Sequence, residues 1–144
     1  MNEPQASYKD RITALLADKG YAVEEQDGQI LRIREVESGL TITGVLENNI
    51  LFCSLVCMTA PSGALTAGVL HKMLDADNGI STSSFQLYPA GDGQTAIALG
   101  NFCTLQNMNE EDEDDILSCI HYLLVDVMAA REILGELATS VNSR

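Results

Sequence analysis

The sequence lacks tryptophan, has only three prolines, and devotes 5% of its 144 residues to aromatic side chains. A core made from this composition must consist mainly of Leu, Ile, Val, Ala and Met. Basic residues are scarce too, because eight Lys and Arg face 21 Asp and Glu, for a formal net charge of −13. A field of that sign repels phosphate backbones and anionic lipids, so the composition argues against nucleic-acid partners and membrane surfaces.

Long hydrophobic runs are missing as well. The longest nearly apolar stretch, residues 50–60, falls short of the roughly 20 residues that span a bilayer as a helix. The first residues, MNEPQAS, are polar and show neither the basic nor the apolar segment of a secretory signal. We therefore expect a cytoplasmic protein without membrane insertion, whose four cysteines are reduced.

What the chain does contain is typical of a globular protein. Hydrophobic residues make up 46% of it and charged residues 20%, which is far from the composition of disordered chains. At this length we expect a single domain over residues 1–144, with loose termini at 1–7 and 139–144.

Hydrophobic periodicity predicts three helices and five strands. Helical spacing and capping residues place the helices at 8–19, 64–75 and 110–138. Alternating or continuous apolar runs, separated by turns such as Asp27-Gly28, place the strands at 29–36, 40–45, 50–58, 82–88 and 95–104. The order α-β-β-β-α-β-β-α indicates an α+β fold with a five-stranded antiparallel sheet and a long C-terminal helix.

The strand at 50–58, ILFCSLVCM, is apolar on both faces. This pattern predicts a central strand that is covered on both sides, by helices or by a partner subunit. The long last helix could cover the second face within the monomer, or a second copy or a client protein could do so. The residues that we expect at such an interface are Phe52, Ser54, Val56, Phe102, Ile116, Ile120, Leu123 and Val127.

This order of elements resembles the type III secretion chaperone-like architecture that bacterial YbjN-like proteins share. The resemblance covers essentially the whole chain and lies in topology and composition. No short string, such as ITGVLENNILFCSLV or QTAIALGNFCTL, carries a functional motif that could be transferred. Members of the group are small, acidic, cytoplasmic and often dimeric, so the resemblance implies a chaperone-like or regulatory protein-binding role.

Side chains capable of chemistry show no catalytic pattern. Cys53 and Cys57 would lie roughly 13 Å apart on a strand, too far for a shared metal or a disulfide, so the cysteines are expected to be buried and structural. A redox or metal role assembled across strands is the alternative. His71 and His121 lack a ligand-pair spacing, and Ser62 lacks a nucleophile elbow. We predict no catalytic, metal or cofactor residues, hence no enzyme.

Arg32 and Arg34 form a close basic pair on one face of a predicted strand. They could bind an anionic group, but Glu24, Glu25 and Glu35 are near in sequence. Cross-strand ion pairing is therefore the favoured interpretation.

The most conspicuous polar feature is a run of six acids directly before the last helix. Asn109 can cap that helix, with Asp112 in the capping-box position, and acids in a first turn meet the positive end of the helix dipole. Helix initiation together with solubility is the favoured interpretation. Docking of a basic partner segment and a weak cation site stay open. The acids are Glu110, Glu111, Asp112, Glu113, Asp114 and Asp115.

Together these observations predict a protein–protein interaction module that forms a homodimer or binds an unidentified protein partner. It would act through an apolar surface of the sheet and long helix. A small ligand-binding protein or enzyme with a pocket between helix and sheet is one alternative. A structural homo-oligomer without a client is another.

Overall fold

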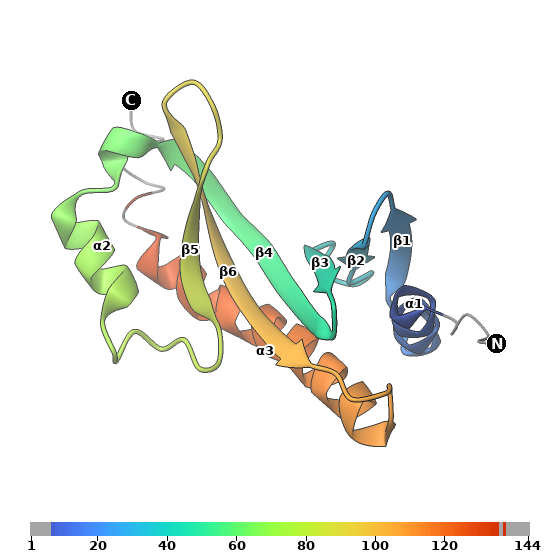
Figure 1. The fold of residues 1–144 in the computed structure, drawn as a ribbon. Helices are drawn as coiled ribbons and strands as arrows, with labels where there is room; N and C mark the ends of the chain where they lie inside the picture. The colour runs from blue at the N-terminus through green and yellow to red at the C-terminus, as the bar shows by residue number, and fades with distance from the viewer. Residues whose placement is uncertain (1–6, 136, 138–144) are drawn as a thin grey trace. The chain divides into compact units, whose positions relative to one another are not determined.

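The computed structural model describes residues 7–135 and residue 137. This part of the chain forms three α-helices and six strands in the order α-β-β-β-β-α-β-β-α (Figure 1). Hydrogen-bonded neighbours in the sheet follow the order β1-β2-β3-β4-β6-β5. The elements are α1 (Tyr8–Asp18), β1 (Ala22–Gln26), β2 (Ile30–Arg34), β3 (Thr41–Glu47), β4 (Ile50–Pro61), a short 3-10 helix (Ser62–Ala64), α2 (Ala67–Leu74), β5 (Ser84–Pro89), β6 (Gln94–Thr104) and α3 (Glu110–Ile133).

The α+β class, the three helices and the antiparallel sheet are confirmed, but the predicted strand number was wrong. The sheet has six strands, because β1 pairs with β2 through all five of its residues. Its sequence, AVEEQ, contains the acidic residues that strands usually avoid and no apolar alternation. Glu24 and Glu25 are tolerated here because β1 is an edge strand with its side chains largely in solvent.

The chain divides into two compact units. The first comprises the residues up to Ser54 and Asn101–His121, and the second comprises Leu55–Gly100 and the residues from Tyr122. β4, β6 and α3 each contribute residues to both units. The single domain that chain length predicts stays a prediction.

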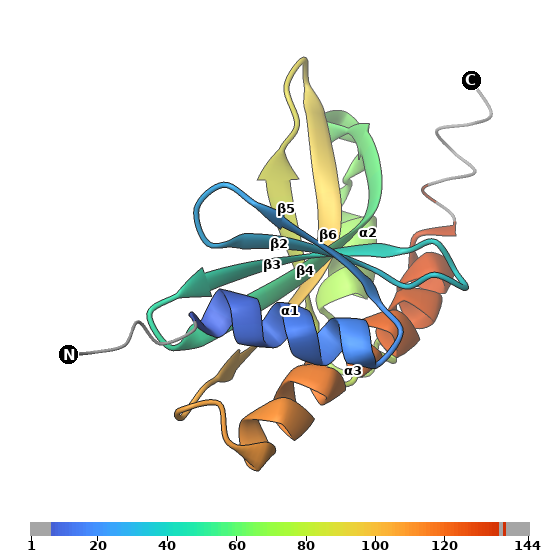
Figure 2. The ribbon, with the colours of Figure 1, turned by 90° about the vertical axis from the view of Figure 1, so that its right-hand side faces the viewer.

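In the first unit, β1, β2, β3 and the start of β4 form an antiparallel meander. α1 contacts β1 and β2 (Figure 2), and its Ile12 and Leu16 are fully buried. Side chains alternate between buried and exposed along the strands, so that Leu31, Ile42 and Cys53 face inward. The predicted N-cap of the first helix is confirmed, since Ser7 Oγ accepts a hydrogen bond from the Asp10 amide at 3.1 Å. The predicted loose ends at 1–6 and 139–144 lie outside the described residues.

In the second unit, β5 and β6 form an antiparallel pair in which Phe85 opposes Leu99 (Figure 1). A small core joins these strands to α2 and the end of α3. It consists of Ala60, Met73, Ile97, Leu134 and Leu137. Thr66 caps α2, which begins three residues later than predicted because the 3-10 turn precedes it.

The strand predicted to be covered on both faces is central, but among residues 7–135 and 137 only one of its faces is buried. Leu51, Cys53 and Leu55 are buried, whereas Phe52 is 40% exposed and Val56 is 57% exposed. Periodicity reports which residues are apolar, and it does not report whether a helix of the same chain reaches them.

Candidate functional site

The first unit leaves one side of its meander open. We call this side the outer face and define it by the side chains that alternate with the buried ones on β1–β4, together with Phe102 of β6. Its members are Ala22, Glu24, Gln26, Ile30, Arg32, Arg34, Thr41, Thr43, Val45, Glu47, Ile50, Phe52, Ser54 and Phe102.

An apolar row crosses the outer face. The strand register places Ile30 opposite Val45, and Val45 opposite Phe52. Phe52 continues the row to Phe102, with ring centroids 6.0 Å apart and planes tilted by 41°. Such tilted aromatic pairs attract each other, yet Phe52 remains 40% and Phe102 61% exposed. The row therefore ends in two aromatic side chains that the chain leaves in contact with solvent.

The other predicted interface residues are distributed differently. Ser54 lies half-buried on the outer face, and Val56 is exposed on the part of β4 that belongs to the second unit. The four predicted interface residues of α3 are 0–1% exposed, so they offer no side-chain surface to a partner. They are Ile116, Ile120, Leu123 and Val127. Their four-three spacing marks the core stripe of the helix.

The acidic run begins α3, as predicted. Asn109 Oδ1 accepts the Asp112 amide at 2.9 Å, which confirms the cap. The Asp112 carboxylate does not return to Asn109. It accepts the Met108 amide at 2.8 Å and also the Gln106 amide, and it is 3% exposed. Asp112 therefore fixes the preceding loop through hydrogen bonds. Its buried carboxylate is not available for docking a basic partner segment.

That loop has an unusual backbone. Asn107 and Met108 have φ values of 66° and 54°, a left-handed conformation that is uncommon outside glycine. Arg11 of α1 donates to the carbonyl of Met108 at 3.0 Å, and the Asn107 amide donates to Tyr8 Oη at 3.2 Å. Side chains from both helices thus hold the turn that starts α3.

The remaining acids of the run stay on the surface. Glu113 is half-buried, and Glu110, Glu111, Asp114 and Asp115 are exposed. Docking of a basic segment at these positions stays a prediction. In the described residues, no three His, Cys, Asp or Glu side chains gather as a metal ion would require.

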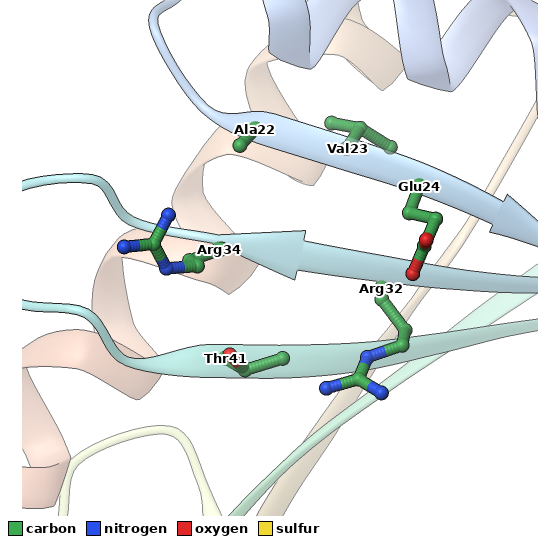
Figure 3. A pocket seen from close by; sticks show the side chains of 6 residues that line it. All are labelled: Ala22, Val23, Glu24, Arg32, Arg34 and Thr41. Atoms are coloured by element: carbon green, nitrogen blue, oxygen red, sulfur yellow. The ribbon is translucent and has the colours of Figure 1, made fainter.

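The predicted cross-strand ion pairing of the arginines is not found. The register does place Arg32 opposite Glu24. Within residues 7–135 and 137, however, neither the Arg32 nor the Arg34 guanidinium group forms an ion pair or hydrogen bond. Opposite register brings the Cβ atoms together, but the Arg32 side chain extends away from Glu24 (Figure 3).

Cys103 and Cys119 are in contact in the first unit, and Cys53 lies near them, which their sequence separation did not predict. Cys53 and Cys103 are buried, as expected, and the Cys103 thiol is hydrogen-bonded to Cys119. This hydrogen bond lowers the pKa of Cys119 because it stabilises the thiolate, although burial opposes it. The same bond and burial raise the pKa of Cys103, and burial raises that of Cys53.

These pKa directions predict an order of thiol reactivity, because the thiolate is the reactive form. At pH 7.5 Cys119 is expected to react first with a thiol reagent, ahead of Cys57, whose pKa burial raises to about 11. Timed labelling with peptide mapping measures the order. Cys103→Ala removes the hydrogen-bond donor and is expected to slow the labelling of Cys119 several-fold, whereas first labelling at Cys57 would contradict the prediction.

The burial of one acidic residue was not predicted from the sequence. Asp126 of α3 is 2% exposed, and its carboxylate accepts the Ser81 amide at 3.1 Å, Ser81 Oγ at 3.0 Å and the Ser83 amide at 3.3 Å. Within the second unit it therefore fixes the segment before β5. A signal was present, because Asp126 lies three residues after Leu123 and four before Ala130, on the apolar stripe.

Two hollows of the first unit are open to solvent. One, of about 320 Å³, is lined by Ser7, Tyr8, Gln29, Leu46 and Asn48. The other, of about 200 Å³, lies beside Arg32 and Arg34. The groups with shifted pKa values line neither hollow. These groups are Tyr21, Cys53, Cys57, Cys103, Cys119 and Asp126.

Comparison with known proteins relies on structure, because no protein-family model and no curated protein sequence matches the chain. The crystal structure of YbjN, a candidate transcription regulator from E. coli, superimposes with a TM-score of 0.62 at 18% identity, covering 85% of this chain and 90% of YbjN. This chain has the YbjN fold. The predicted resemblance to YbjN-like proteins is thereby confirmed at the level of fold.

A second solved structure has a similar fold. It is an uncharacterized protein from Methanothermobacter thermautotrophicus, with a TM-score of 0.57 at 10% identity, over 92% of this chain and 98% of that one. The YbjN-like fold therefore occurs in chains of very different sequence. In the described residues of this chain, no helix is both long and apolar enough to cross a membrane.

Proposed function

We propose that this chain is a non-enzymatic interaction module that binds a protein partner through the outer face. The exposed Phe52–Phe102 pair carries the proposal. Exposed aromatic side chains beside an apolar row are the features that anchor protein interfaces. The chaperone-like or regulatory role that the YbjN-like fold suggests would use this face.

The face is a better candidate than the strand edge. A partner strand could in principle pair with the free edge of β1. Glu24 and Glu25 lie on that edge strand, and charged side chains are a common device against edge pairing. The apolar row lies three strands away, around Phe52, where side-chain packing can supply the affinity.

The charge of the chain bears on the kind of partner. YbjN is described as a candidate transcription regulator, and a regulator can act on DNA or on another protein. A net charge of −13 opposes contact with a phosphate backbone. We therefore propose a cytoplasmic protein as the partner, either a second copy of this chain or a different protein.

Replacing both aromatic residues tests the proposal. Phe52→Ser with Phe102→Ser is expected to weaken partner binding by at least about tenfold, since hot-spot side chains contribute more than about 1.4 kcal/mol each. Leu74→Ser is the matched control, because Leu74 is a 76% exposed apolar residue of α2 and is not a member of the outer face. Circular dichroism verifies that both variants fold.

Two measurements define the partner. Light scattering gives the mass of the purified protein, and native affinity capture with mass spectrometry identifies bound proteins. A dimeric mass that the double variant loses identifies a second copy as the partner. A captured protein that the double variant loses and Leu74→Ser retains identifies a different one. A monomer with no reproducible partner contradicts the proposal.

A further inference from the structure

Two arginine side chains share the outer face with the apolar row, in an arrangement that the proposed function does not use. Arg32 and Arg34 alternate with buried residues on β2, so both belong to the same side of the sheet, although their flexible side chains extend in different directions (Figure 3). Alternate residues of a strand are roughly 6.6 Å apart along the chain. Two guanidinium groups can therefore approach one ligand from neighbouring positions.

The neighbours of Arg34 leave room around it. In the register Arg34 lies between Ala22 of β1 and Thr41 of β3, which are both small side chains. The result is a hollow of about 200 Å³, which is lined by Ala22, Val23, Glu24, Arg32, Arg34 and Thr41. Drug-sized ligands occupy roughly 300 Å³ or more, so this hollow suits one charged group and not a large molecule.

Both guanidinium groups lack a partner in the described part of the chain. Arg11 shows the contrast, since its Nη atoms donate to the carbonyls of Asn107 and Met108. A protein with 21 acids and eight bases has ample carboxylates with which to pair an arginine. The only acid that lines the hollow is Glu24, and it leaves the charges of Arg32 and Arg34 without an ion pair.

We propose that Arg32, Arg34 and Thr41 form a binding site for a phosphate group. Guanidinium groups bind phosphate oxygens through paired N–H donors, and the Thr41 hydroxyl adds a donor at the border of the hollow. Two positive charges match a phosphate that is mostly doubly charged above pH 7. This phosphate site is independent of the proposed partner binding, because the protein can bind phosphate without binding a partner, and the reverse also holds.

Arginine side-chain NMR tests the site directly. Inorganic phosphate is titrated at pH 7.5 and constant ionic strength, while the Nε–Hε signals of Arg32, Arg34 and Arg11 are followed. We expect saturable shifts at Arg32 and Arg34, with half-saturation at low millimolar phosphate, and no shift at Arg11. Acetate, a single negative charge, is expected to bind at least about tenfold more weakly.

Variants separate a local site from general charge effects. Arg32→Gln and Arg34→Gln are each expected to weaken phosphate binding about tenfold, whereas Lys19→Gln removes the same charge elsewhere and leaves binding unchanged. Glu24→Gln removes a repelling carboxylate and is expected to tighten binding a few-fold. Linear shifts without saturation, or equal losses in Lys19→Gln and the arginine variants, would overturn the proposal.

The source of the phosphate is resolved with two further ligands, a small phosphate monoester and a peptide that contains phosphoserine. Tighter binding of the peptide than of the monoester indicates a phosphorylated protein segment, and equal binding indicates a small molecule. Either result supports the phosphate site. Because purified protein and defined ligands are used, failure here leaves the tests of partner binding unaffected.

Discussion

Replacing Asp126 by alanine is expected to lower the free energy of unfolding by about 3 kcal/mol, because it removes a buried carboxylate that accepts three part-buried hydrogen bonds from Ser81 and Ser83. Urea denaturation monitored by circular dichroism measures the change. Ser81→Ala removes only the hydroxyl donor and should cost about 1 kcal/mol or less. A loss in Asp126→Ala no larger than that of Ser81→Ala would contradict the prediction.

The same carboxylate should make stability depend on pH. Burial alone would raise the pKa of Asp126, but the hydrogen bonds from Ser81 and Ser83 outweigh burial and lower it. Because the folded pKa lies below the unfolded value, the stabilisation is complete above the unfolded pKa and is lost as pH falls through the folded pKa. The stability difference between the native protein and Asp126→Asn should therefore shrink as pH falls from about 5 to 2. A constant difference would show that the charge of Asp126 contributes nothing.

Asp112→Ala is expected to cost about 2–4 kcal/mol, since the carboxylate holds the amides of Gln106 and Met108 in a turn with left-handed φ angles. Without it, the loop loses the contacts that compensate its backbone strain. Urea denaturation again gives the free energy of unfolding, and hydrogen exchange shows whether the start of α3 opens first.

Neighbours in the same acidic run supply controls of equal charge. Glu111→Ala and Asp114→Ala remove exposed carboxylates, and each should change stability by no more than about 0.5 kcal/mol. If all three variants lost the same stability, the effect would arise from the charge of the run and not from the hydrogen bonds of Asp112. The comparison thus separates one structural acid from the surrounding surface acids.

Much of the fold follows from local patterns in the sequence. The apolar stripe from Ile116 to Leu134 predicted α3, and the Asn109 cap predicted its start. The Asp27-Gly28 turn implied a strand on each side. The strand before it, β1, was not predicted, because its sequence AVEEQ contains two acidic residues. Propensity alone could not recover β1, because an exposed edge strand relaxes the usual preferences.

Other features depend on contacts between distant residues. The proximity of Cys53, Cys103 and Cys119 requires the sheet and α3 to be in place, so their spacing gives no sign of it. The exposure of the outer face could not be predicted from the sequence either. A strand with two apolar faces can be covered by its own chain or by another chain. Asp112 and Asp126 did leave a sign in the sequence, because Asp126 lies within the apolar stripe of α3 at helical spacing and Asp112 lies four residues before its first member, Ile116. An acid at such a position indicates a buried carboxylate that has found donors.

The carboxylate of Asp112 also gives the loop before α3 a spectroscopic signature. The amide hydrogens of Gln106 and Met108 point at a negative charge instead of a carbonyl. Charged acceptors shorten and strengthen such bonds, which moves amide proton resonances to high frequency. Two displaced signals that vanish in Asp112→Ala would therefore report, residue by residue, on the closing of this turn.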